Sequence, residues 1–218
     1  MLSLPVRRSG LVALVAAVLG LLILPLITVA YAVSGDGAGS DPAWGPAVRD
    51  LVGPLVTFAE PDTVYSAYGK VYLLVLLGLL VGLLGLFRLR QGGVSGPERW
   101  GFRLSVLGLV ASLGGVVTDY TVFEDTPVEN LGFVIGSLIG LLLLVVGSLL
   151  LGVAWLRVDG APRLGAWLVL LAVPGMVALG ALGFGNLPSM PIAWFCVAWL
   201  ALGRYLLGHD APVSVSTR

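Results

Sequence analysis

The feature that most constrains this chain is a series of six long apolar segments. They cover residues 10–33, 68–89, 101–122, 130–156, 164–184 and 191–207. A helix needs roughly 20 apolar residues to cross the hydrocarbon core of a bilayer, with a range of about 17–25. Only 11% of the residues are charged, whereas a soluble domain carries about 25%. The sequence therefore predicts an all-α polytopic membrane protein, one transmembrane domain over residues 1–218 with a bundle of six helices.

The distribution of positive charge predicts the orientation of these helices, because cytoplasmic loops are enriched in Lys and Arg. If the segments alternate across the bilayer, ten of the 12 basic residues fall on one side. These are Arg7, Arg8, Arg88, Arg90, Arg99, Arg103, Arg157, Arg163, Arg204 and Arg218, against Arg49 and Lys70 on the other. Of the 12 acidic residues, three lie on the arginine-rich side (Glu98, Asp159 and Asp210) and nine opposite. We therefore expect both termini in the cytoplasm. The excess of Arg over Lys is typical of a GC-rich genome, and we expect the plasma membrane of a prokaryote.

The first segment has an alternative interpretation. Arg7 and Arg8 precede an apolar run that ends at Ala30-Tyr31-Ala32, which resembles a signal peptide with a small-residue cleavage site. The run is longer than the roughly 7–15 apolar residues of such a signal, so a retained helix is favoured.

The outer loop 34–67 is the only long connection. Apolar residues at i, i+3 and i+4 (Val48, Leu51 and Val52) predict a short helix, which Gly53-Pro54 ends. A second apolar stretch follows over residues 54–59. We expect one or two short helices lying on the outer membrane surface, with Trp44 and Phe58 as interfacial anchors. A lid over a pocket is the alternative.

Small residues recur at steps of four in the fourth segment, at Gly132, Gly136 and Gly140. Small side chains allow a second helix backbone to approach closely, which promotes helix association in lipid. The pattern predicts a packing face. It serves either the core of one chain, which we favour, or contact with a protein partner or a second copy.

Two prolines, Pro25 and Pro174, lie near the middle of the first and fifth segments. Each removes a backbone hydrogen bond and is expected to kink its helix. Broken helices at the bilayer midplane form the binding sites of many transporters, but a plain kink is the simpler interpretation.

The candidate polar site lies at the outer ends of the second and third segments. Asp119 and Lys70 are placed to form an ion pair there, and more acids follow in the next loop. The candidate outer cluster comprises Asp119, Lys70, Tyr120, Glu124, Asp125 and Glu129. It either binds a cation or cationic solute or is simply a solvated acidic loop, which we favour.

Several chemistries are excluded by counts. Cys196 is the only cysteine and His209 the only histidine. A disulfide within the chain, a bis-histidine haem and a zinc site built from several His or Cys ligands are therefore impossible. We expect no catalytic residues, cofactor, metal or nucleic-acid partner.

Three classes of function remain. We expect a non-catalytic membrane protein, an accessory, structural or assembly component whose surroundings are the lipid bilayer and a possible protein partner. A small-solute transporter or channel is the first alternative. A membrane enzyme with an outward-facing acidic site is the second.

Overall fold

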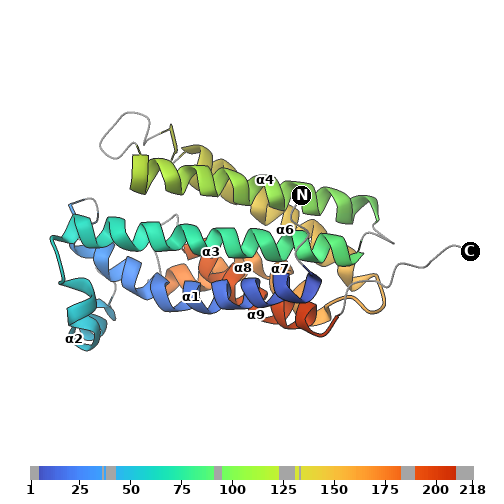
Figure 1. The fold of residues 1–218 in the computed structure, drawn as a ribbon, viewed down its shortest axis with the longest axis horizontal. Helices are drawn as coiled ribbons and strands as arrows, with labels where there is room; N and C mark the ends of the chain where they lie inside the picture. Colours follow the sequence, from blue (N-terminus) through green and yellow to red (C-terminus); the bar gives the residue numbers. More distant parts are fainter. Residues whose placement is uncertain are drawn as a thin grey trace, which may run out of the picture.

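The described part of the chain is all-helical. A computed structural model describes residues 5–35, 37, 43–90, 95–122, 131–132, 134–182 and 190–209. It is 88% helical, with no strand among these residues. The long helices lie side by side in an elongated bundle (Figure 1).

Each predicted apolar segment corresponds to a helix or to a pair of helices. The helices are α1 (Val6–Val33), α2 (Gly45–Val56), α3 (Pro61–Arg90), α4 (Gly96–Val117), α6 (Gly140–Leu156), α7 (Arg163–Leu170), α8 (Ala172–Ala181) and α9 (Met190–Leu207). Two π-helical turns, η1 (Thr118–Val122) and η2 (Val134–Ile139), extend the end of α4 and precede α6. Helix α3 begins well before residue 68, because its first turns are too polar to register as an apolar segment.

Four helices are long and apolar enough to cross a membrane: Val6–Val33, Pro61–Arg90, Gly96–Tyr120 and Val134–Leu156. Helices α7 and α8 pass the same test only as a pair, bent by 59°. Helix α9 is apolar but shorter. The described residues thus contain four or five helices that meet the criterion for a span.

Basic residues gather at one end of the bundle, where α1, α4 and α7 begin and α3, α6 and α9 end. We call it the arginine end; Figure 1 shows α2 at the opposite end, the α2 end. The described arginines near the arginine end are Arg7, Arg8, Arg88, Arg90, Arg99, Arg103, Arg157, Arg163 and Arg204.

The outer surface of the bundle is apolar along its length. On α1, Leu11, Val15, Val18 and Leu22 are 53%, 58%, 46% and 65% exposed. Soluble monomers rarely expose continuous apolar surface of this extent. Such a surface is suited to contact with lipid tails.

The predicted packing glycines lie against α4 of the same chain. A Cβ built on Gly136 would lie 2.4 Å from the Cα of Gly115, and one on Gly140 would lie 3.0 Å from the carbonyl oxygen of Gly108. A Cβ on Gly132 would lie 1.6 Å from the hydroxyl oxygen of Thr118. At Gly136 and Gly140 the near atoms include backbone, so α4 and the η2–α6 segment are in backbone contact, whereas Gly132 faces the side chain of Thr118 in η1.

A second group of tightly packed helices consists of α1, α3 and α9. A Cβ on Gly78 would lie 2.3 Å from the Cβ of Ala16, and one on Gly82 would lie 2.5 Å from the Cβ of Ala13. On α9, a Cβ on Gly203 would lie 3.1 Å from the carbonyl oxygen of Gly10. Small residues therefore bring α1 close to both of its neighbours.

The two prolines behave differently. Helix α1 continues without interruption through Pro25. The fifth segment breaks at Leu171 (φ −82°, ψ 14°), one turn before Pro174. Pro174 has no N–H to donate to the carbonyl of Leu170, which contributes to the break, but Pro25 shows that a proline does not by itself interrupt a helix in this bundle.

Two hydrogen bonds attach α2 to its neighbours, the end of α8 and helix α3. The indole N–H of Trp44 donates to the carbonyl of Leu182 (2.8 Å), and the hydroxyl of Tyr68 donates to that of Leu55 (2.7 Å). The helix runs through Gly53-Pro54 to Val56, with a kink at Val52. The backbone angles at Val52 are non-helical, so two short helices meet there, and the second begins at Gly53-Pro54, where the first was expected to end.

Candidate functional site

The predicted outer cluster is only partly described. Tyr120 is buried in η1, and its hydroxyl lies 2.7 Å from that of Tyr65 on α3. The two rings meet edge to face, with centroids 5.3 Å apart. Lys70 has an exposed side chain and Asp119 a half-buried one. Their ion pair stays a prediction.

The remaining acids of this cluster, Glu124, Asp125 and Glu129, lie outside the described residues. An acidic site that uses them therefore also stays a prediction. At the α2 end, the tyrosine pair joins α3 to η1. A Cβ on Gly69 would lie 2.3 Å from the Tyr120 ring, so glycine there makes room for that ring.

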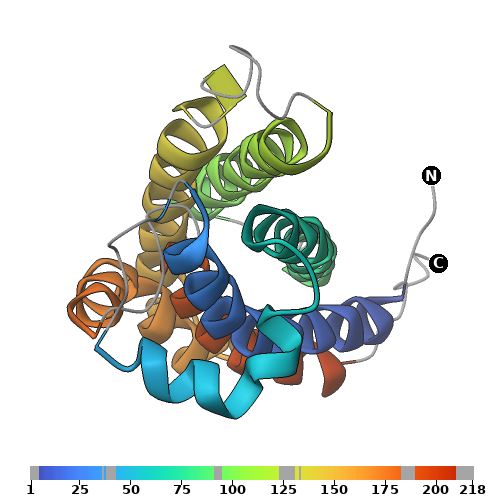
Figure 2. The ribbon, with the colours of Figure 1, turned by 90° about the vertical axis from the view of Figure 1, so that its left-hand side faces the viewer.

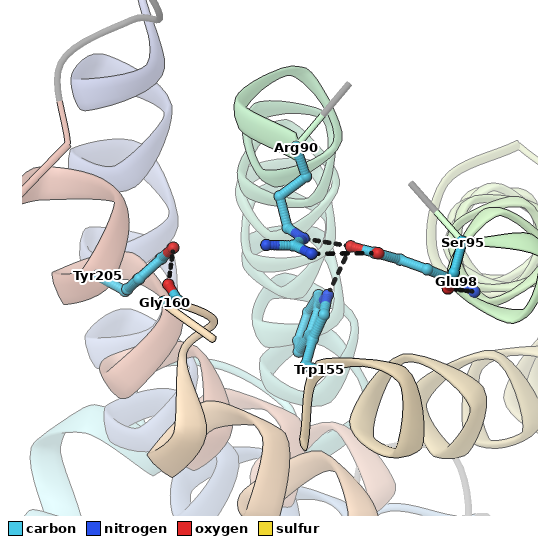
Figure 3. Close-up of polar contacts among 6 residues, drawn as sticks. All are labelled: Arg90, Ser95, Glu98, Trp155, Gly160 and Tyr205. Carbon is cyan, nitrogen blue, oxygen red and sulfur yellow. Dashed lines mark hydrogen bonds and ion pairs between the residues drawn. The ribbon is translucent and has the colours of Figure 1, made fainter. Parts of the chain in front are cut away.

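A second polar cluster, which sequence reasoning missed, lies at the arginine end. It consists of Arg90 at the end of α3, Glu98 in the first turn of α4 and Trp155 at the end of α6. Figure 3 shows the three side chains pointing toward one another. We call it the Glu98 clasp. The side chain of Glu98 is 0% exposed and that of Arg90 is 11% exposed.

Both carboxylate oxygens of Glu98 are engaged. Arg90 donates through Nε to Oε1 and through Nη2 to Oε2, the latter at 3.2 Å. The indole N–H of Trp155 donates to Oε1 at 2.9 Å. A buried carboxylate is costly unless it is paired and hydrogen-bonded, and these contacts satisfy that requirement. The clasp joins the end of α3 to the start of α4, eight residues further along the chain, and joins both to the end of α6, which is distant in sequence.

Local sequence places Glu98 in the first turn of α4 but does not decide where its carboxylate points. Ser95 is the N-cap of α4 and accepts a hydrogen bond from the Glu98 N–H at 3.4 Å. A glutamate three residues after such a cap usually returns its side chain to the cap N–H. Here the carboxylate turns to Arg90 and Trp155 instead. The Ser95-to-Glu98 spacing was a visible signal for the helix start but not for the clasp.

Next to the clasp, Tyr205 on α9 connects to the turn between α6 and α7. Its hydroxyl donates to the carbonyl of Gly160 at 2.8 Å, and its ring stacks against that of His209. Gly160 has φ 75°, a left-handed conformation that favours glycine. Figure 3 shows this contact beside the clasp. Two sets of polar contacts thus join the helices at the arginine end: the Glu98 clasp among α3, α4 and α6, and the bond from α9 to the turn after α6.

A small cavity lies inside the bundle. It has a volume of about 20 Å³ and is lined by residues of α3, α4, α6, α7 and α9, among them Ser105, Ser148, Trp155 and Leu83. Ser105 is 1% exposed, and no described residue accepts or donates a hydrogen bond at its hydroxyl. Most of the side chains that line the cavity are apolar.

Among the described residues, no group of three or more His, Cys, Asp or Glu side chains comes together as metal ligands would. The arrangement thus offers a paired carboxylate, a tyrosine pair and a small cavity. No protein-family model matches the chain, and comparisons with curated proteins and with solved structures gave no match either.

Proposed function

We propose that this protein is a non-catalytic component of a prokaryotic plasma membrane, an accessory or assembly subunit that crosses the bilayer six times. In this proposal α7 and α8 form one bent span and α9 the sixth. The apolar outer surface supports residence in the bilayer. The gathering of arginines at one end supports a cytoplasmic location for that end and both termini.

The observation that carries the proposal is the engagement of Glu98. A carboxylate that transfers protons or contacts a substrate must be reachable by water or by that substrate. The carboxylate of Glu98 is fully buried and is bonded to Arg90 and Trp155. Its contacts hold α3, α4 and α6 together, which is a structural role.

The test is purification of the tagged full-length protein from its native membrane in a mild detergent, followed by mass spectrometry. We expect a second protein in stoichiometric amount. The control is Gly136→Leu, which places a side chain where the backbone of Gly115 lies and should disrupt the bundle. A true partner is lost with this variant, whereas a contaminant that binds the tag or the micelle remains.

Recovery of the wild-type protein alone, or as a homo-oligomer, would contradict the accessory role. The second candidate is then small-solute transport, which the cavity inside the bundle and the 59° break between α7 and α8 favour. Its test is the rate of solute-driven swelling of liposomes that contain the protein. Liposomes without protein and liposomes with Gly136→Leu are the controls, and equal rates in all three would exclude it.

A further inference from the structure

Helix α1 carries a shallow apolar groove on its exposed face. The groove has a volume of about 320 Å³ and opens to the outside of the bundle. Its lining residues all belong to α1 and are Leu14, Val15, Val18, Leu19 and Leu22. Figure 1 shows α1 running the length of the bundle from the arginine end to the α2 end, so the groove lies along the surface that would face lipid.

The groove lacks the small residues by which helices associate closely in lipid. On α1, such residues face inward: Ala13 and Ala16 are buried against glycines of α3, and Gly20 lies against Cys196 of α9. Only Leu and Val line the groove, so a further helix there would be held farther from α1 than α3 and α9 are. The groove is better suited to a flexible hydrocarbon chain than to another helix.

Two exposed arginines, Arg7 and Arg8, lie in line with the groove at the arginine end. With about 3.6 residues per helical turn, positions seven apart share nearly the same direction from the helix axis. Leu14 therefore follows Arg7 on the helix surface, and Val15 and Leu22 follow Arg8. The groove and both arginines share one strip of the surface of α1.

The charges of these two arginines are not balanced by neighbouring acids. The first turn of α1 contains no acidic residue. Arg90 and Arg163 each pair with a carboxylate, whereas neither Arg7 nor Arg8 forms an ion pair with a described residue. Two adjacent, uncompensated cations at the level of the headgroups favour a lipid with a net negative charge over a zwitterionic one.

The dimensions of the strip match one leaflet of a bilayer. From Arg8 to Leu22 the helix rises by about 21 Å at 1.5 Å per residue. Half of a bilayer, including its headgroup region, is about 20–22 Å thick. A lipid whose phosphate lies at the arginines would therefore have its acyl chain beside the groove.

We propose that α1 binds one anionic phospholipid of the leaflet at the arginine end. Its phosphate contacts the guanidinium groups of Arg7 and Arg8, and one acyl chain occupies the groove from Leu14 to Leu22. The proposal requires that α1 crosses the membrane. It does not require that the protein has a partner protein, so it can fail or succeed separately from the accessory role.

The first test identifies the lipid that stays bound. The full-length protein is reconstituted in phosphatidylcholine vesicles that contain a minor fraction of phosphatidylglycerol, extracted in a mild detergent and studied by native mass spectrometry. We expect a complex with one phosphatidylglycerol to exceed the complex with phosphatidylcholine. Replacing both arginines, by Arg7→Gln and Arg8→Gln, should lower the bound phosphatidylglycerol by about tenfold.

A matched control separates this site from general attraction to the arginine end. Arg99 and Arg103 are also exposed there, on α4, and Figures 1 and 2 show α3 between α1 and α4. Arg99→Gln with Arg103→Gln removes the same charge from the same end and should leave the bound phosphatidylglycerol unchanged. An equal loss in both double variants, or no loss in either, would overturn the site on α1.

The second test places the acyl chain. Val18→Trp puts a fluorescent ring in the groove, and its added fluorescence is measured with phosphatidylglycerol or phosphatidylcholine brominated in the acyl chains, each at the same mole fraction. We expect stronger quenching by the brominated phosphatidylglycerol, and equal quenching once Arg7→Gln and Arg8→Gln are added. Val146→Trp, at an exposed position of α6, should be quenched equally by both lipids.

Two results of the second test would contradict the proposal. Equal quenching of Val18→Trp by the two lipids would show that the groove does not select an anionic lipid. Weak quenching by both would show that a protein surface covers the groove. In that case Val18→Cys identifies a second copy of the chain if it forms a disulfide-linked dimer in the membrane. Val15→Trp is the alternative reporter if Val18→Trp does not fold.

Discussion

At the scale of the residue, Glu98 is the one acid among the described residues that is buried. Its substitution should therefore change the free energy of unfolding more than that of any other described acid. Glu98→Gln keeps an acceptor for Trp155 but leaves the guanidinium of Arg90 largely buried without a counter-charge. Breaking a buried ion pair from one side costs about 3–5 kcal/mol. We expect a loss of about 3 kcal/mol, measured as unfolding in detergent. As a control, Asp159→Asn removes the partner of Arg163 in a pair whose side chains are 105% and 74% exposed, and it should leave stability unchanged.

The tyrosine pair makes a second prediction at this scale. Tyr120→Phe removes one hydroxyl of the 2.7 Å contact with Tyr65 and should cost about 1 kcal/mol. Tyr65→Phe and the double variant complete a double-mutant cycle. A coupling free energy near zero would show that the two hydroxyls do not stabilise the fold through each other.

At the scale of the element, the contact between α4 and η2–α6 depends on adjacent glycines with opposite surroundings. A Cβ on Gly115 would lie 2.7 Å from the Cα of Gly136, whereas nothing lies within 4 Å of one on Gly114. Gly115→Ala should therefore destabilise the protein by about 1–3 kcal/mol through overpacking. Gly114→Ala should be neutral or stabilising, since alanine is the better helix former. Equal thermal stability of the two variants would contradict this packing.

At the scale of the whole molecule, the gathering of arginines predicts which end faces the cytoplasm. Single cysteines at Thr57 near the α2 end and at Asp159 near the arginine end are both at exposed positions. A membrane-impermeant maleimide added to intact cells should label Thr57→Cys but not Asp159→Cys, and both after lysis. Native Cys196 is buried and should give little background. The opposite labelling pattern would reverse the proposed orientation.

Much of the helical architecture could be predicted from the sequence, and little of the site. The apolar segments correspond to the long helices, and the fifth segment breaks one turn before Pro174, one of the two prolines at which a kink was expected. The packing face of Gly132, Gly136 and Gly140 was also visible as a pattern. The Glu98 clasp was not, because Glu98 looks like an ordinary first-turn acid near an N-cap. The candidate outer cluster remains partly outside the described residues, so most of it stays a prediction.

The sequence by itself determined that this chain forms apolar helices and that its positive charges gather at one end of them. The first property depends on local composition, and the second on successive segments running in opposite directions. Both can be read from the sequence directly. The tertiary structure alone decided that Arg90, rather than a neighbouring arginine, pairs with Glu98, and that Trp155 serves both the clasp and the cavity. These contacts depend on the rotation and separation of packed helices. Those quantities arise from many weak side-chain contacts at once, and no single segment specifies them.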